Sequence, residues 1–213
     1  MTRPRVLLAD DHQIVAEGLR SLLEREFELV GIVSDGREAL AAVEALRPDV
    51  VVLDITMPSL NGIEAAQQLR AADSPVKVVF LTMHSDVTYA VRALDAGAAG
   101  FVLKHAAAAE LVTAIHHALQ GRIYVTPLIA ADLLEAYRER EHGQKSTFDQ
   151  LTSRQREVLQ LVAEGRTAKE IAQILHISPR TAEFHRARLL EVLGAESTAE
   201  LIQYAIRHGL TQG

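Results

Sequence analysis

The stretch Val50-Val51-Val52-Leu53-Asp54 joins four consecutive apolar residues, three of them β-branched, to a carboxylate. An uninterrupted apolar run of this kind is typical of a strand buried on both faces, as in the parallel sheet of an α/β domain. A carboxylate inside a core is costly, so we expect Asp54 where the strand emerges, at its carboxyl end. In open α/β sheets that edge binds ligands. An aspartate that merely caps a loop is the alternative for this residue.

The chain around this stretch alternates between strand and helix patterns. Runs rich in Val, Ile and Leu predict strands, and apolar residues at helical spacing predict helices between them. The predicted strands cover residues 5–9, 27–34, 50–54, 76–82 and 101–103, and the predicted helices cover 14–23, 37–46, 63–69, 87–96 and 110–119. Five strands alternating with five helices predict an α/β fold with a doubly wound, five-stranded parallel sheet.

Polar side chains stand at the carboxyl ends of four predicted strands. They are Asp10 and Asp11 after the first, Asp54 after the third, Thr82 at the end of the fourth and Lys104 after the fifth. Three carboxylates at one rim repel each other unless a cation holds them, and an all-oxygen donor set favours Mg²⁺. A hydroxyl and an ammonium group opposite them suit the oxygens of a phosphoryl group. The set therefore indicates phosphoryl transfer to a carboxylate. Asp35, beside Ser34 and Gly36, is interpreted as a turn residue instead.

Together with Met57-Pro58 after Asp54, these residues resemble the receiver domain of bacterial two-component response regulators, a flavodoxin-like fold, over about residues 3–122. The resemblance implies that Asp54 is the phosphoacceptor. It also implies that Asp11 and Asp54 bind Mg²⁺ together with the backbone carbonyl of Thr56, and that Asp10 reaches the metal through water.

The resemblance gives further roles to three residues outside the acidic set. Lys104 would bind a phosphoryl oxygen, and Thr82 would hydrogen-bond to the phosphate once it arrives. Phe101 stands where the family has its switch aromatic residue. A plain core position in a short strand is the alternative for Phe101, and it is compatible with a switch that changes the burial of the ring.

Bulk composition limits the classes of protein that fit. The absence of cysteine excludes disulfides and thiolate metal sites, and no apolar stretch reaches the roughly 18 residues of a membrane span. Residues 1–5 lack the apolar segment of a signal peptide. We therefore expect a cytoplasmic protein with no membrane partner.

Charge and composition divide the chain. Residues 1–146 contain 14 Lys and Arg against 20 Asp and Glu, a net charge of −6, whereas residues 147–213 contain 8 of each. The predicted domains are residues 1–122, a linker over 123–147, and residues 148–213. In the linker, Thr126-Pro127 predicts a helix start, with a weak apolar stripe of Leu128, Ala131, Leu134, Ala136 and Tyr137. Residues 138–146 contain no apolar side chain and are predicted to be flexible.

The last domain is predicted to be small and all-α. Two short helices around His176-Ile177-Ser178 form a helix-turn-helix pattern, although a small bundle for protein contacts has the same periodicity. The helix over 180–193 favours DNA, because Phe184 projects from the face opposite the apolar one. Thymine methyl groups in a major groove would explain an outward aromatic ring.

Residues 151–201 resemble the LuxR-type helix-turn-helix, which makes the whole chain similar to the NarL/FixJ group of response regulators. The resemblance implies that seven residues of this helix take part in DNA binding. Glu183, Phe184 and Ala187 would face the bases, and Arg180, His185 and Arg188 would lie in or near the positions that contact phosphates. Thr181 would support the start of the helix. Val192 replaces the usual Lys, and Glu196 stands where a basic or polar residue is common. Because phosphate contacts supply much of the affinity, we expect a monomer to bind DNA weakly.

The resulting hypothesis is a DNA-binding transcriptional regulator whose partners are a sensor histidine kinase, DNA, a second copy of the chain after phosphorylation, and RNA polymerase. It accepts a phosphoryl group and is not a turnover enzyme. A phosphohydrolase that uses Asp54 as its nucleophile is a rival, but it would need a second carboxylate two residues later, where Thr56 stands. A regulator that acts without phosphorylation is the other rival.

Overall fold

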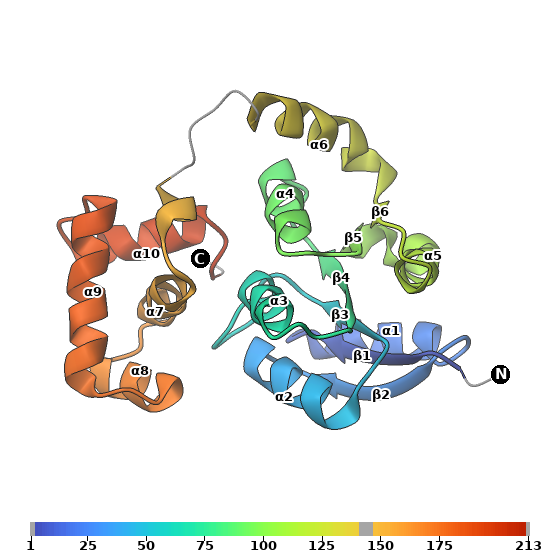
Figure 1. Ribbon diagram of the computed structural model, residues 1–213, viewed down its shortest axis with the longest axis horizontal. Helices are drawn as coiled ribbons and strands as arrows, with labels where there is room; N and C mark the ends of the chain where they lie inside the picture. The colour runs from blue at the N-terminus through green and yellow to red at the C-terminus, as the bar shows by residue number, and fades with distance from the viewer. Residues whose placement is uncertain (1–2, 141–146, 212–213) are drawn as a thin grey trace. The chain divides into compact units, whose positions relative to one another are not determined.

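The computed structural model describes residues 3–140 and 147–211, which divide into two compact units (Figure 1). The first unit holds strands β1–β6 and helices α1–α6. The second holds the short 3-10 helix η2 and helices α7–α10.

The first unit is built on one parallel sheet with the strand order β2-β1-β3-β4-β5-β6. Its strands are β1 (Arg5–Ala9), β2 (Glu28–Val33), β3 (Val50–Leu53), β4 (Lys77–Thr82), β5 (Gly100–Leu103) and β6 (Tyr124–Val125). The predicted α/β fold and its five strands are confirmed. The sixth strand is an addition that the sequence patterns did not indicate, because two residues are too few to show a period.

Helices cover both faces of the sheet, as a doubly wound fold requires. They are α1 (Gln13–Leu23), α2 (Gly36–Leu46), α3 (Gly62–Ala71), α4 (Val87–Asp95) and α5 (Ala107–Leu119), with the one-turn 3-10 helix η1 (Lys104–Ala106) before α5. Alternate residues of β1 and β3, such as Val6, Leu8 and Val52, form one core with α1 and α5. The side chains between them point to the other face and are also fully buried, which explains the uninterrupted apolar run of β3.

The third strand lies inside the sheet, between β1 and β4. Asp54 follows it directly, and its backbone N–H donates to the carbonyl of Ala9 at 2.9 Å. This bond aligns the carboxyl ends of β1 and β3. Asp10 and Asp54 therefore leave the sheet at the same edge. The predicted turn role of Asp35 is confirmed, since its side chain caps α2 by accepting from the N–H groups of Arg37 and Glu38.

The segment after α5 belongs to the first unit. Residues 124–125 pair with β5, and α6 (Pro127–Arg140) packs against α4 (Figure 1). The predicted helix start is confirmed, but the predicted apolar stripe is wrong in part. Ile129 and Leu133 are the buried residues of α6, whereas three members of the predicted stripe, Leu128, Ala131 and Leu134, are exposed. Part of the predicted flexible segment, residues 141–146, lies outside the described residues.

The second unit is all-α, as predicted. It comprises η2 (Phe148–Gln150), α7 (Ser153–Ala163), α8 (Ala168–Leu175), α9 (Pro179–Leu193) and α10 (Thr198–Arg207). Thr152 and Thr167 each form a capping box with the residue three positions on, which fixes the starts of α7 and α8. Their apolar faces build a separate core around Leu159, Ile171 and Leu189. Among the residues that the structure describes, no helix has the length and apolarity to cross a bilayer.

Candidate functional site

Lys104 connects two carboxylates at the carboxyl edge of the sheet. Its Nζ lies 2.6 Å from Oδ2 of Asp54 and 2.8 Å from Oδ2 of Asp10. The three side chains come from the ends of β1, β3 and β5, and each is at most 5 % exposed. The structure thus brings together three residues that the sequence placed at separate strand ends.

Burial controls the protonation of this group. It raises the pKa of Asp54 from 3.8 to about 6, since the attraction of Lys104 only partly offsets the loss of water around the carboxylate. Burial also disfavours the charge on Lys104, but Asp54 and Asp10 outweigh it and raise the pKa of the ammonium group above its ordinary value. Asp54 is therefore a carboxylate at neutral pH that lacks full charge compensation.

The acidic cluster can hold a cation. One ligand atom from each of Asp10, Asp11, His12 and Asp54 lies within 4.8 Å of the others. The three carboxylates are hard oxygen donors of the kind that Mg²⁺ prefers, so the donor chemistry fits the predicted metal. The sequence analysis did not predict that His12 belongs to this cluster, although the residue directly follows Asp10-Asp11 and could have been recognised from that position. Its Nδ1 lies 2.8 Å from Oδ1 of Asp11.

A second histidine that the sequence did not single out, His84, contacts the loop that follows Asp54. His84 Nε2 is 2.8 Å from Oγ1 of Thr56, and the backbone N–H of His84 donates to Oγ1 of Thr82 at 3.1 Å. The His84 ring also stacks on Tyr89 at a centroid distance of 4.3 Å. These contacts join the loop after β3 to the loop after β4, so the side chains of Thr56 and Thr82 occupy one connected network.

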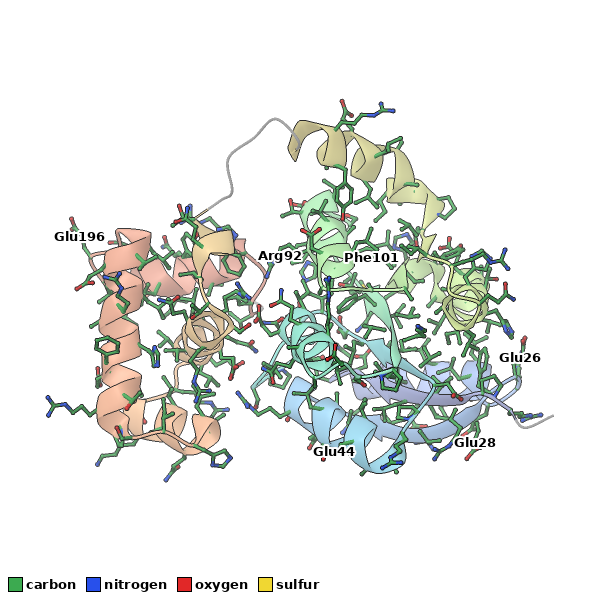
Figure 2. All side chains as sticks on the ribbon, viewed as in Figure 1. Glu26, Glu28, Glu44, Arg92, Phe101 and Glu196 are labelled. Carbon is green, nitrogen blue, oxygen red and sulfur yellow. The ribbon has the colours of Figure 1, made fainter. Side chains whose placement is uncertain are left out.

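Phe101, labelled in Figure 2, lies within β5 between Phe80 of β4 and Val125 of β6 and has no solvent exposure. The end of the same strand is anchored by Thr126, which precedes α6. Its Oγ1 accepts from the N–H of Leu103 at 3.2 Å and donates to Glu110 Oε2 at 2.7 Å. The ring is therefore a core residue in this structure, and β5 is tied to both α5 and the start of α6.

The helix-turn-helix of the second unit is formed by α8 and α9. His176 ends α8 in the left-handed region at φ 53°, which permits the sharp turn between the helices. Ser178 then caps α9, with its side chain accepting from the N–H of Thr181 and its Oγ 2.8 Å from Oγ1 of Thr181. Thr181 thus stabilises the start of the helix, and Pro179 occupies the first turn, where its missing N–H costs nothing.

The outward face of α9 carries most of the residues predicted to contact DNA. Arg180, Glu183, Phe184, Ala187 and Arg188 are exposed, and Thr181 and His185 are half-buried. Phe184 is 66 % exposed, an unusual position for a phenylalanine, and its ring meets that of His185 edge-on at a centroid distance of 5.9 Å.

Ion pairing and packing explain two features of the charges on α9. Arg188 forms an ion pair within its own helix, since its Nη1 lies 2.7 Å from Oε2 of Glu191. Val192 packs against the helical core, which accounts for an apolar residue there, whereas Glu196 is exposed (Figure 2).

Comparisons with known proteins agree with both units. Residues 6–116 match the family described as response regulator receiver domain, and residues 149–205 match bacterial regulatory proteins of the luxR family. The response regulator UvrY of Escherichia coli K12 is 34 % identical over 207 residues, covering 96 % of this chain and 94 % of UvrY.

Solved structures give the same result. A LuxR-family two-component response regulator from Aurantimonas sp. is 39 % identical with a TM-score of 0.61, covering 64 % of this chain and 99 % of that one. The structure of two RcsB dimers bound to two parallel DNAs covers 99 % of this chain and 100 % of that one at 26 % identity, with a TM-score of 0.60. These families are transcriptional regulators and not turnover enzymes. The chain therefore belongs to the two-component response regulators of the NarL/FixJ group, which join a receiver domain to a LuxR-type DNA-binding domain.

Proposed function

We propose that Asp54 accepts a phosphoryl group from a sensor histidine kinase and that this reaction controls DNA binding by the second unit. The observation that carries the proposal is the bridge from Lys104 to Asp54 and Asp10, at 2.6 and 2.8 Å. An ammonium group held at this point is already placed to bind an oxygen of a phosphoryl group on Asp54. In the transfer, a carboxylate oxygen of Asp54 bonds to phosphorus as the bond from phosphorus to the donor histidine nitrogen breaks.

The acidic cluster would hold Mg²⁺ through Asp11, Asp54 and the carbonyl of Thr56, with Asp10 acting through water. When bound, the ion would offset the negative charge of the carboxylates and of the incoming phosphoryl group. His12, at 2.8 Å from Asp11, orients that carboxylate from the solvent side. Lys104, at 2.6 Å from Asp54, already compensates part of the charge on that carboxylate.

The change after phosphorylation would run through Thr82 and β5. The Thr82 hydroxyl accepts from His84 and keeps its own hydrogen, which it can donate to a phosphoryl oxygen on Asp54. Phe101 has no exposed surface here, so a switch at this residue requires the packing around β5 and β6 to rearrange and not merely the ring to turn inward.

DNA recognition is assigned to α9. Glu183, Phe184 and Ala187 would face bases, Arg180, His185 and Arg188 would contact phosphates, and Thr181 would support the start of the helix. Arg188 would have to exchange its ion pair with Glu191 for a phosphate. Residues 147–213 contain 8 basic and 8 acidic side chains, so the second unit has no net positive charge and one copy is expected to bind DNA weakly. We therefore propose that a phosphorylated homodimer binds two half-sites, as the RcsB dimers in complex with DNA suggest. A cytoplasmic location and contact with RNA polymerase complete this proposal.

Intact-mass measurement with acetyl phosphate and Mg²⁺ tests the central step. The wild-type chain should gain one phosphoryl group, which hydroxylamine should remove because it is an acyl phosphate. Asp54→Asn should gain none, and the matched Asp86→Asn change at the exposed cap of α4 should leave the reaction intact. Phosphorylation of Asp54→Asn at the wild-type rate would refute the assignment, and failure of the wild type with both acetyl phosphate and a cognate kinase would favour a regulator that acts without phosphorylation.

A further inference from the structure

His12 occupies the N-cap position of α1 without acting as a cap. Short polar side chains normally stand there because they accept from the first N–H groups of the helix, as Asp35 and Asn61 do at α2 and α3. Within the described residues 3–140, the His12 side chain makes no such bond at α1. Its ring lies against the carboxylates of the acidic cluster instead, and its backbone N–H donates to Oδ1 of Asp10 at 2.9 Å, which fixes the residue there. The start of the helix therefore does not explain this histidine.

One nitrogen of this ring is close to all three carboxylates. Nδ1 lies 2.8 Å from Oδ1 of Asp11, 3.5 Å from Oδ1 of Asp10 and 4.0 Å from Oδ2 of Asp54. Two atoms bound to the same ion at about 2.1 Å are about 3.0 Å apart at a right angle and about 4.2 Å apart on opposite sides of the ion. The three separations are close to that range, so Nδ1 and the carboxylate oxygens can share one cation.

The shortest of these contacts requires something between its two atoms. A nitrogen lone pair and a carboxylate oxygen repel each other at 2.8 Å unless a hydrogen or a cation lies between them. A hydrogen on Nδ1 meets this requirement when no metal is bound. Because either nitrogen of a neutral imidazole can carry the hydrogen, a ring with its hydrogen on Nε2 directs the lone pair of Nδ1 at the cluster. The side chain of His12 is 44 % exposed, so an ion from solvent can reach it.

We infer that His12 is a nitrogen ligand of this metal site, so that the site binds divalent transition ions such as Co²⁺ more tightly, relative to Mg²⁺, than three carboxylates alone would. Mg²⁺ prefers oxygen atoms and keeps several of its waters, whereas imidazole suits the later first-row transition ions. The chain contains no cysteine, so no thiolate competes for such an ion. The inference rests on the proposed phosphoacceptor role of Asp54 for its biological use, because the ligand set then decides which cation offsets the charge of the phosphoryl group.

Calorimetric titration of the full chain with Co²⁺ and with Mg²⁺, without a phosphodonor, measures this selectivity. His12→Asn keeps a good N-cap residue at α1, and His12→Ala excludes a contact through the amide oxygen of Asn. Both changes should raise the Kd for Co²⁺ at least about ten-fold. The Kd for Mg²⁺ should change less than about two-fold, because a water can take the place of the imidazole on Mg²⁺.

His176→Asn is the matched control for these titrations. It removes an exposed histidine at the end of α8, where φ is 53°, a conformation that Asn adopts readily. Neither Kd should change in this variant. Equal weakening of Co²⁺ and Mg²⁺ binding in the His12 variants would overturn the inference, because His12 would then only orient Asp11. An unchanged Kd for Co²⁺ would overturn it as well.

Proton NMR of the Co²⁺-loaded chain tests the contact itself. Ring hydrogens of an imidazole bound to Co²⁺ are shifted far outside the ordinary proton range, and labelling with ring-deuterated histidine identifies them by their loss. The wild type and His176→Asn should show these signals, excess Mg²⁺ should remove them, and both His12 variants should lack them. Their absence from the Co²⁺-loaded wild type, or their persistence in the His12 variants, would refute the ligand.

Intact mass with acetyl phosphate and Mg²⁺ separates this inference from the proposed function. A wild type that gains a phosphoryl group but shows no histidine signal with Co²⁺ refutes the ligand and leaves the phosphoacceptor role of Asp54 standing. A wild type that shows the histidine signal but gains no phosphoryl group supports the ligand while the proposed function fails.

Discussion

Replacement of Asp54 by Asn should stabilise the receiver unit at neutral pH. Folding raises the pKa of this carboxyl from 3.8 to about 6, so the folded chain binds the proton more tightly than the unfolded chain does. The stabilising effect of that proton is complete below pH 4 and is lost as the pH rises through 6. A difference of about 2 pH units corresponds to about 3 kcal/mol. Asn resembles the protonated carboxyl in shape and charge, and Lys104 keeps Asp10 at 2.8 Å.

Urea denaturation followed by circular dichroism in metal-free buffer measures this effect. The free energy of unfolding of Asp54→Asn should exceed that of the wild type by up to about 3 kcal/mol at pH 8 and by about half as much at pH 5. Asp86→Asn is the matched control, because Asn caps a helix about as well as Asp and this residue is exposed. Added Mg²⁺ should stabilise the wild type more than the variant. A variant that is less stable than the wild type at pH 8, or a difference that does not change with pH, would refute the account of Asp54 as a buried and undercompensated carboxylate.

Four further variants test catalysis, packing and recognition separately. Lys104→Ala should slow phosphorylation from acetyl phosphate by at least about ten-fold while Mg²⁺ binds more tightly, because a competing cation is gone; the rate of mass gain and calorimetry measure the two effects, and weaker Mg²⁺ binding would contradict the assigned role. Gly62→Ala should destabilise the chain by about 3 kcal/mol in urea, since the new Cβ would lie 2.1 Å from the carbonyl oxygen of Asp54. Gly18→Ala, in a helix with open space around it, should instead stabilise by about 1 kcal/mol. Phe184→Ala should weaken operator binding by about 1–3 kcal/mol without changing stability, because the ring is 66 % exposed; equal DNA affinity would exclude it from the base-facing row.

The strand ends could be predicted from the sequence because two independent signals coincide there. Strands β1, β3, β4 and β5 are largely buried apolar runs, and parallel strands bring their carboxyl ends to one edge, so residues far apart in the chain were predicted to meet. The ion pairs of Lys104 with Asp10 and Asp54 fulfil that prediction. Their distances and the raised pKa of Asp54 were not accessible, since both depend on burial in three dimensions.

Helix α6 shows where periodicity is insufficient. Its apolar residues occupy two faces, so spacing alone could not decide between Leu128 and Leu134 on one side and Ile129 and Leu133 on the other. Packing against α4 chose the second pair. The contact between His84 and Thr56 was missed for a related reason, because it joins two loops 28 residues apart that have no periodic pattern.

The position of β5 gives the proposed phosphorylation of Asp54 a route by which it could act on α6. This strand ends at Lys104, which holds Asp54, and it pairs through Phe101 with β6. The hydroxyl of Thr126, directly before α6, accepts from the N–H of Leu103, one residue before Lys104. If the ammonium group of Lys104 left the two carboxylates to bind a phosphoryl oxygen, the end of β5 would therefore be displaced. The hydrogen bonds of this strand also fix the start of α6. Because Thr126 donates to Glu110 of α5 as well, a small displacement of β5 must be absorbed by α5 or by α6. Thirteen-residue α5 is packed into the core on one whole face, whereas α6 rests on α4 through few buried side chains. The displacement should consequently appear at α6, the element that precedes the DNA-binding unit.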